Sequence, residues 1–158
     1  MKKIVIIVVI VLVIISMALV LFLKPKNDIE PNESVTNNTI GADSIKIVVD
    51  DKELIVELED NLSVNELLDK LESGSITSDL KEYGGFEKVG NLGFSLSRSD
   101  KYLKAGPRDV LLYNGNQVTI LYGDNTWNYT KLGTITNVSN EELTSILGEG
   151  DVTVTITK

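Results

Sequence analysis

The sequence predicts a mainly β domain, a closed antiparallel β-barrel with two short helices, preceded by an N-terminal transmembrane helix. Three observations lead to this expectation. From Ser44 onward, apolar and polar residues alternate along several short runs, which is the pattern of strands with one buried face. Helical spacing of apolar residues is confined to two short segments of that region. One long apolar run lies near the amino terminus.

The amino-terminal segment, residues 1–26, contains an apolar run at residues 4–23 in which Ser16 is the one polar side chain. A helix that rises about 1.5 Å per residue needs about 20 residues to cross the hydrocarbon core of a bilayer. Lysines flank the run on both sides. We therefore expect residues 4–23 to span the cell membrane once and to anchor the chain there.

Cleavage as a signal peptide is the alternative, because Ser16-Met17-Ala18 resembles a small-residue cleavage site. Residues 19–23 stay apolar after that site, so a retained anchor is the leading interpretation. The flanking lysines are balanced and indicate orientation only weakly. We expect an extracytoplasmic domain, which cleavage would instead release as a secreted protein.

Residues 27–43 are rich in Asn, Thr, Ser, Asp and Glu and contain almost no apolar side chains. Such a composition cannot bury enough apolar surface to fold, so it predicts a flexible polar linker. The folded domain is then expected at residues 44–158.

The domain is expected to open with a β-hairpin. Apolar residues alternate with polar ones at positions 45–49 and again at 54–58, on either side of a polar turn. Ser63 and Glu66 have the spacing of a capping box, in which the serine oxygen and the glutamate side chain satisfy each other's backbone amides. This predicts a short helix over residues 64–72 that ends near Gly74.

Residues 75–101 have weak periodicity and many turn residues, and they predict two short strands or loops. A second hairpin is expected from residues 110–113 and 117–122, because Asn114-Gly115-Asn116 between them tolerates the positive φ of a tight turn. Residues 127–136 predict another strand.

The last segment repeats the logic of the first helix. Ser139 and Glu142 form a second capping-box pattern, which predicts a helix that ends at Gly148. Alternating residues at 152–156 predict a closing strand. Seven or eight strands with so few helices exclude a helical bundle and disfavour a parallel α/β sheet, and closure into a barrel removes exposed strand edges.

Composition excludes several functions. From Ser44 onward, 11 lysines and arginines stand against 19 aspartates and glutamates, so nucleic acid is not an expected partner. The chain contains no cysteine and no histidine, which excludes disulfides, thiol chemistry and a Ser/His/Asp triad. No metal site, no cofactor and no catalytic residue is predicted.

Four segments together resemble the bacterial cyclophilin-like domain family, small proteins with a cyclophilin-fold barrel. They are residues 79–88 (DLKEYGGFEK), 96–100 (LSRSD), 112–117 (LYNGNQ) and 122–133 (YGDNTWNYTKLG). The chain departs from the family pattern at Ser97, where proline is usual, and at Arg108, where glycine is usual.

The resemblance implies a fold more firmly than an activity. Cyclophilins are prolyl isomerases whose pocket combines an arginine with apolar and aromatic side chains, a glutamine and commonly a histidine. Because this chain has no histidine, the leading hypothesis is a module that binds a peptide or small ligand without catalysis. The alternative is a peptidyl-prolyl cis-trans isomerase that acts on exported proteins. No oligomeric state is predicted.

The candidate ligand-binding residues combine polar groups with aromatic rings. An arginine could bond a carbonyl or carboxylate, although a surface arginine often pairs with a neighbour such as Asp100. A glutamine could donate or accept, or could simply bridge two strands. Aromatic rings can face a ligand or fill the core. The candidates are Arg98, Gln117, Trp127, Tyr122, Tyr129 and Phe94.

Overall fold

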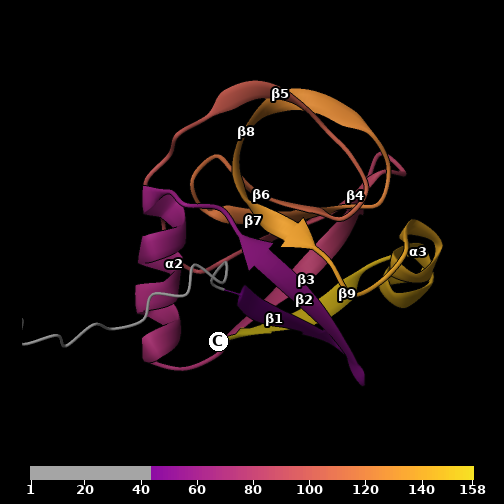
Figure 1. The fold of residues 1–158 in the computed structure, drawn as a ribbon. Coiled ribbons are helices and arrows are strands. Elements are labelled where there is room, and N and C mark those ends of the chain that lie inside the picture. Colours follow the sequence, from indigo (N-terminus) through magenta and orange to yellow (C-terminus); the bar gives the residue numbers. More distant parts are fainter. Residues whose placement is uncertain (1–43) are drawn as a thin grey trace, which may run out of the picture. The chain divides into compact units, whose positions relative to one another are not determined.

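A computed structural model describes residues 44–158, which form a mainly β fold with two helices (Figure 1). The predicted membrane span at residues 4–23 and the predicted linker at 27–43 lie outside the described residues. Within residues 44–158, neither helix has the length and apolar character needed to cross a membrane. The helices are α2 (Leu62–Glu72) and α3 (Asn140–Leu147). The strands are β1 (Ser44–Val49), β2 (Lys52–Leu58), β3 (Ile76–Tyr83), β4 (Glu87–Asn91), β5 (Lys101–Ala105), β6 (Asp109–Tyr113), β7 (Gln117–Leu121), β8 (Asn125–Ile135) and β9 (Val152–Thr157).

The strands pair antiparallel in the order β2-β1-β9-β3-β4-β7-β6-β8-β5. A further pairing joins β2 to β8, with Val56 opposite Ile135 and Leu58 opposite Gly133, so all the strands except β5 form a ring. The two backbones approach closely there: a Cβ on Gly133 would lie 2.3 Å from the carbonyl oxygen of Glu57. The prediction of a mainly β, antiparallel fold with two helices is confirmed, and its strands are arranged in a ring.

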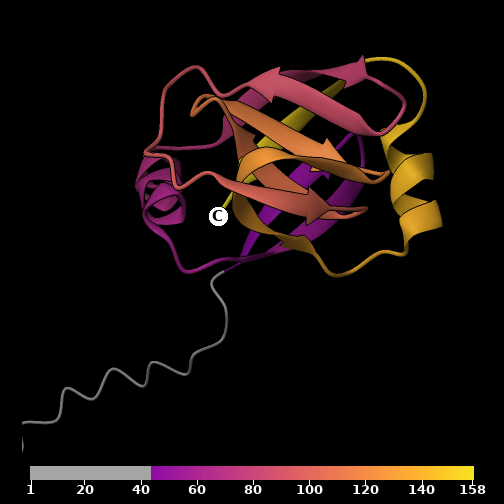
Figure 2. The same cartoon turned by 90° about the horizontal axis from the view of Figure 1, so that it is seen from above.

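The main hydrophobic core fills the inside of this ring. Alternation places Ile45, Ile47 and Val49 of β1 inside, and Val118 and Ile120 of β7 join them. The two helices lie at opposite ends of the ring in both views (Figures 1 and 2). Each helix adds its buried leucines to this core, among them Leu67 of α2 and Leu143 of α3.

A second, smaller apolar cluster lies on the other face of β6 and β7. The first part of β8 pairs with β5, and the later part pairs with β6 and β2, with a register shift opposite Val110 and Leu111. The β5–β8 ribbon therefore arches over β6 and β7 (Figure 1). The buried members of this cluster are Ala105, Leu111, Leu121 and Tyr129.

The predicted capping box at Ser63 and Glu66 is wrong. Helix α2 is capped by Asn61, whose side-chain oxygen accepts a hydrogen bond from the Val64 amide at 3.0 Å. Ser63 and Glu66 instead hold the distant Ser97: the Ser63 hydroxyl donates to the Ser97 carbonyl, and the Glu66 carboxylate accepts from the Ser97 amide and hydroxyl, all at 2.6 Å. Because the Asn61 side chain already caps the Val64 amide, Ser63 and Glu66 are free for this long-range contact.

The second capping box is confirmed. The Ser139 hydroxyl accepts from the Glu142 amide at 3.2 Å, and the Glu142 carboxylate accepts from the Ser139 amide at 2.8 Å. Helix α3 ends at Gly148, as predicted, with φ +61°. The hairpin turn at Asn114 and Gly115 also has the expected positive φ values, +52° and +80°.

Candidate functional site

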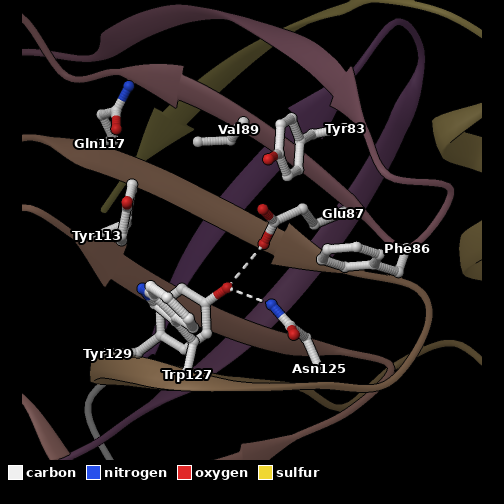
Figure 3. Close-up of a pocket in the computed structure, with 9 residues that line it drawn as sticks. All are labelled: Tyr83, Phe86, Glu87, Val89, Tyr113, Gln117, Asn125, Trp127 and Tyr129. Atoms are coloured by element: carbon white, nitrogen blue, oxygen red, sulfur yellow. Dashed lines mark hydrogen bonds between the residues drawn. The ribbon is translucent and has the colours of Figure 1, made fainter.

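A pocket of about 560 Å³ opens on the outer face of the sheet beside the β5–β8 ribbon (Figure 3). Its walls come from four parts of the fold: the β3–β4 turn, the start of β4, the β6–β7 hairpin and the start of β8. The lining residues are Tyr83, Phe86, Glu87, Val89, Tyr113, Gln117, Asn125, Trp127 and Tyr129.

Strand register explains why these side chains converge. Asn125, Trp127 and Tyr129 are alternate residues of β8, so they share one face of that strand. Tyr113 and Gln117 are directly opposite each other across the β6–β7 hairpin. On β4 and its neighbours, Glu87 is paired with Tyr83 of β3 and Leu121 of β7, and Val89 lies two residues further along the same face.

A short hydrogen-bond chain crosses the pocket. The Asn125 side-chain amide donates to the Tyr129 hydroxyl at 2.8 Å, and that hydroxyl donates to Oε2 of Glu87 at 3.0 Å (Figure 3). Glu87 is only 7% exposed. Burial raises the pKa of Glu87, and the hydrogen bond from Tyr129 opposes this only in part. Burial and the adjacent Glu87 carboxyl likewise raise the pKa of Tyr129.

The rings form two edge-to-face pairs. Tyr83 and Phe86 have centroids 6.1 Å apart at 88°, and Tyr113 and Tyr129 have centroids 6.0 Å apart at 64°. Tyr83 and Trp127 remain 61% and 52% exposed, which is unusual for such large apolar surfaces. The pocket thus offers exposed aromatic faces around a buried carboxyl group.

The structure brings together three of the candidates: Gln117, Trp127 and Tyr129 all line the pocket. Arg98 does not line it. Its guanidinium forms an ion pair with Asp100, with Nε 2.9 Å from Oδ2, and its side-chain carbons lie against the turn at Gly115. Asp100 also accepts from the Thr130 hydroxyl at 2.6 Å, so Arg98 takes part in a network that orders its loop.

Tyr122 and Phe94 also lie outside the pocket lining and pack against the main core. The Tyr122 hydroxyl donates to Glu82, and the Lys88 ammonium lies 5.6 Å from the centre of its ring. The Phe94 ring has the Lys70 ammonium at 5.4 Å. Each ring therefore lies near a lysine ammonium elsewhere in the fold, the buried Lys88 for Tyr122 and the exposed Lys70 for Phe94.

Six lining residues were not among the candidates. Tyr83, Phe86 and Glu87 fall within the first segment of the family resemblance, and Tyr113 falls within the third. The aromatic residues on both sides of Gly84-Gly85 were the available signal, because a tight turn brings such neighbours to one edge. Nothing in the local pattern indicated that Glu87, Val89 and Asn125 face the same space.

A second hollow, of about 630 Å³, lies between α2 and residues 95–97. Of its two acidic lining residues, Glu66 and Asp69, Glu66 already accepts two hydrogen bonds from Ser97, and these lower its pKa. In residues 44–158 no group of three or more acidic, histidine or cysteine side chains is arranged to hold a metal ion. The first pocket is therefore the stronger candidate for ligand binding.

Comparisons with known proteins agree with this architecture. A solved structure, that of a hypothetical protein from Archaeoglobus fulgidus, superposes with a TM-score of 0.55 at 14% identity, covering 72% of this chain and 92% of the archaeal one. At that identity the likeness concerns the fold alone. No protein with a curated description matches the chain. The model of the cyclophilin-like family matches residues 47–157, and the chain belongs to that family.

Proposed function

We propose that this protein is a membrane-tethered, extracytoplasmic module that binds a peptide or small ligand in the pocket beside the β5–β8 ribbon. In this proposal the ring of strands is a closed cyclophilin-type barrel, residues 4–23 anchor the chain, and residues 27–43 hold the domain away from the bilayer. The observation that supports binding best is the pocket of about 560 Å³, in which exposed aromatic rings surround a few polar groups.

The chain's single tryptophan gives a direct test, because Trp127 lines the pocket. Peptides and cell-envelope fractions are titrated into the full chain in detergent while tryptophan fluorescence is recorded. A bound ligand should change the emission saturably. Gln117→Ala should weaken the response by about threefold to tenfold, as expected for one lost hydrogen bond.

Arg98→Ala is the matched control, since Arg98 is a polar candidate that lies outside the pocket lining. It should leave ligand affinity unchanged. Equal losses from Arg98→Ala and Gln117→Ala would contradict this location for the binding site, and so would the absence of a response to every fraction tested.

Prolyl isomerisation is the rival function, supported by a glutamine and aromatic rings in one pocket. Against it, the one arginine among the sequence candidates is paired with Asp100 away from that pocket, and none of the nine lining residues is an arginine. A coupled assay on Xaa-Pro peptides separates the two. A rate equal to the uncatalysed one rejects the isomerase and leaves the binding module intact.

The membrane location is tested separately. We expect the full chain to resist alkaline extraction from membranes, and we expect residues 44–158 to be accessible to protease added to the outer side. Deleting residues 4–23 should release the domain into the soluble fraction. A soluble full-length protein or protection from external protease would contradict this part of the proposal.

A further inference from the structure

The pocket has an unusual chemical composition. Five of its nine lining residues are aromatic, and Glu87 is the single lining residue with a formally charged side chain. Aromatic faces are negative at their centres and attract cations, most strongly when water is excluded. A carboxylate among such faces adds a negative charge of its own, so every strong electrostatic feature of the lining has the same sign.

Among residues 44–158, Glu87 forms no ion pair. Its Oε2 accepts from Tyr129, and no other described residue donates a hydrogen bond to Oε1. The neighbouring lysine cannot supply the charge, because successive strand residues face opposite sides. The Lys88 ammonium is instead held by Glu82 and by the carbonyls of Gly148 and Gly150.

A buried carboxylate without a cationic partner is costly, and a ligand that brings the cation would offset that cost. Figure 3 shows the Glu87 carboxyl pointing into the space between Tyr83 and Phe86 on one side and Trp127 and Tyr129 on the other. The exposed rings of Tyr83 and Trp127 provide apolar surface for carbon atoms beside the charge. The acidic chain, with net charge -8, also attracts cations from solution.

We propose that the pocket binds an alkylammonium group, with the charge against Glu87 and the alkyl carbons on the rings of Tyr83, Trp127 and Tyr129. This inference rests on the proposed binding function and adds the chemical class of the ligand. The same group can come from a free small amine or from a lysine side chain of a peptide. Both sources share the recognition chemistry and are separated in the test.

The test uses Trp127 fluorescence of the full chain in maltoside detergent, which carries no choline head group. Choline and 3,3-dimethyl-1-butanol are titrated in parallel, because the two have the same shape and differ in charge. Choline should bind about tenfold more tightly or better, since aromatic faces and a carboxylate favour a cation over a neutral group of the same shape, and tenfold corresponds to about 1.4 kcal/mol. A lysine-containing peptide and its norleucine counterpart form a second pair; tighter binding of the lysine peptide than of choline assigns the source to a peptide.

Glu87→Gln should remove the preference for choline over the neutral alcohol, while Glu87→Asp should keep part of it. Glu57→Gln makes the same change in net charge at an exposed site on β2 and should preserve the preference. Thermal melts of each variant check that it is folded. Equal binding of choline and the alcohol by the wild type, or an undiminished preference in folded Glu87→Gln, overturns the proposal. Saturable binding of the alcohol without a cation preference would overturn this inference and still support the broader binding function. No response to any of these probes, nor to the peptides and envelope fractions of the first test, would contradict both.

Discussion

Glu87 and Lys88 are neighbours in β4, and both are buried, but their side chains face different surroundings. Lys88 points towards the end of the ring near α3, where a carboxylate and two backbone carbonyls surround its ammonium. Glu87 points into the aromatic pocket, where its described hydrogen-bond partner is Tyr129. One strand thus carries a charge whose partners all come from the protein and a carboxyl group that faces the pocket with one hydrogen bond, from Tyr129.

The difference separates a structural charge from one available for binding. A buried ion with a full set of partners holds those partners in place, and removing it leaves them buried without a partner, which destabilises the fold. A buried ion with a partial set raises the free energy of the unbound state, and a ligand can recover that energy. Glu82, the partly exposed partner of Lys88, shows what such partners do: desolvation acts to raise its pKa, but hydrogen bonds from Lys88, Tyr122 and the Gly85 amide, with the Lys88 charge, outweigh this and lower the pKa.

Gly133→Ala should cause the largest loss of stability, because it lies where β2 pairs with β8 to close the ring of strands. The new methyl group would lie 2.3 Å from the Glu57 carbonyl oxygen and 2.7 Å from the Val56 side chain, and a backbone atom cannot move aside cheaply. We expect a loss of about 3 kcal/mol in the free energy of unfolding, measured with urea. Gly106→Ala is the control, because its methyl group meets only the Asp124 carboxylate oxygen at 3.0 Å. Equal losses in the two variants would contradict a tight closure at Gly133.

Lys88→Met tests the satisfied charge itself. The side chain of Lys88 is 0% exposed, whereas that of Glu82 is 32% exposed, so water can partly compensate the abandoned carboxylate. We expect a loss of about 2 kcal/mol, less than for a fully buried pair. Lys81→Met removes a lysine of the neighbouring strand whose ion pair with Asp151 is exposed, and it should change stability little. A Lys88 variant as stable as the Lys81 variant would mean that this region does not depend on its charge.

Tyr129→Phe tests the hydrogen bond that Glu87 accepts in the pocket. It removes the hydroxyl that joins Asn125 to Glu87 while keeping the ring packed in the second cluster. We expect a loss of about 1 kcal/mol in chemical unfolding, the usual net value of a hydrogen bond. Tyr102→Phe, on a side chain that is 72% exposed, should have no effect. A loss of stability as large as that of Lys88→Met would show that the fold depends on the Tyr129 hydroxyl as much as on the Lys88 charge.

The contrast between the two regions also explains how far the sequence could predict the fold. Alternation identified β1, β2 and β9, because each of these strands has one apolar face that packs in the core. The turn residues Asn114 and Gly115 between two apolar runs identified β6 and β7, whose buried residues are consecutive. It was weak in β4, because there the buried residues include Glu87 and Lys88. A pattern method treats charged residues as exposed, so a strand with buried charges is poorly recognised.

The site was predictable to the extent that its residues sit on strong local patterns. Gln117, Trp127 and Tyr129 belong to well-marked strands, whereas Glu87 became visible only when β4 was paired with β3 and β7. Arg98 was attractive because of its chemistry, and the structure engages it with Asp100. The pairing of β4 with β7, by contrast, joins distant parts of the chain and leaves no trace at short sequence spacing.

One departure from the family pattern has a clear backbone basis. Arg108, where the family usually has glycine, has φ +77°, a value that glycine adopts without strain and that side chains rarely adopt. Its buried Nε also has no hydrogen-bond partner in the described structure. The conformation that links β5 to β6 would therefore suit a glycine better than an arginine, which agrees with the glycine that the resemblance implies.

The smallest expected effect, and the one most specific to the pocket, is the pH dependence of Glu87→Gln. Burial raises the pKa of Glu87 in the folded state, so protonation favours folding. Below the unfolded-state value of about 4.3, both states are protonated, and the variant and wild type should differ little in this contribution. As pH rises from there through the folded pKa, the wild type loses stability relative to the variant, and the difference levels off above it.

The pKa values of Tyr129 and Tyr122 are raised from values already near 10, so neither side chain titrates in this range. Urea unfolding in a pH series measures the difference, with Glu57→Gln as the matched control; a difference that is constant with pH, or that favours the wild type as pH rises, would show that Glu87 is as well satisfied as Lys88.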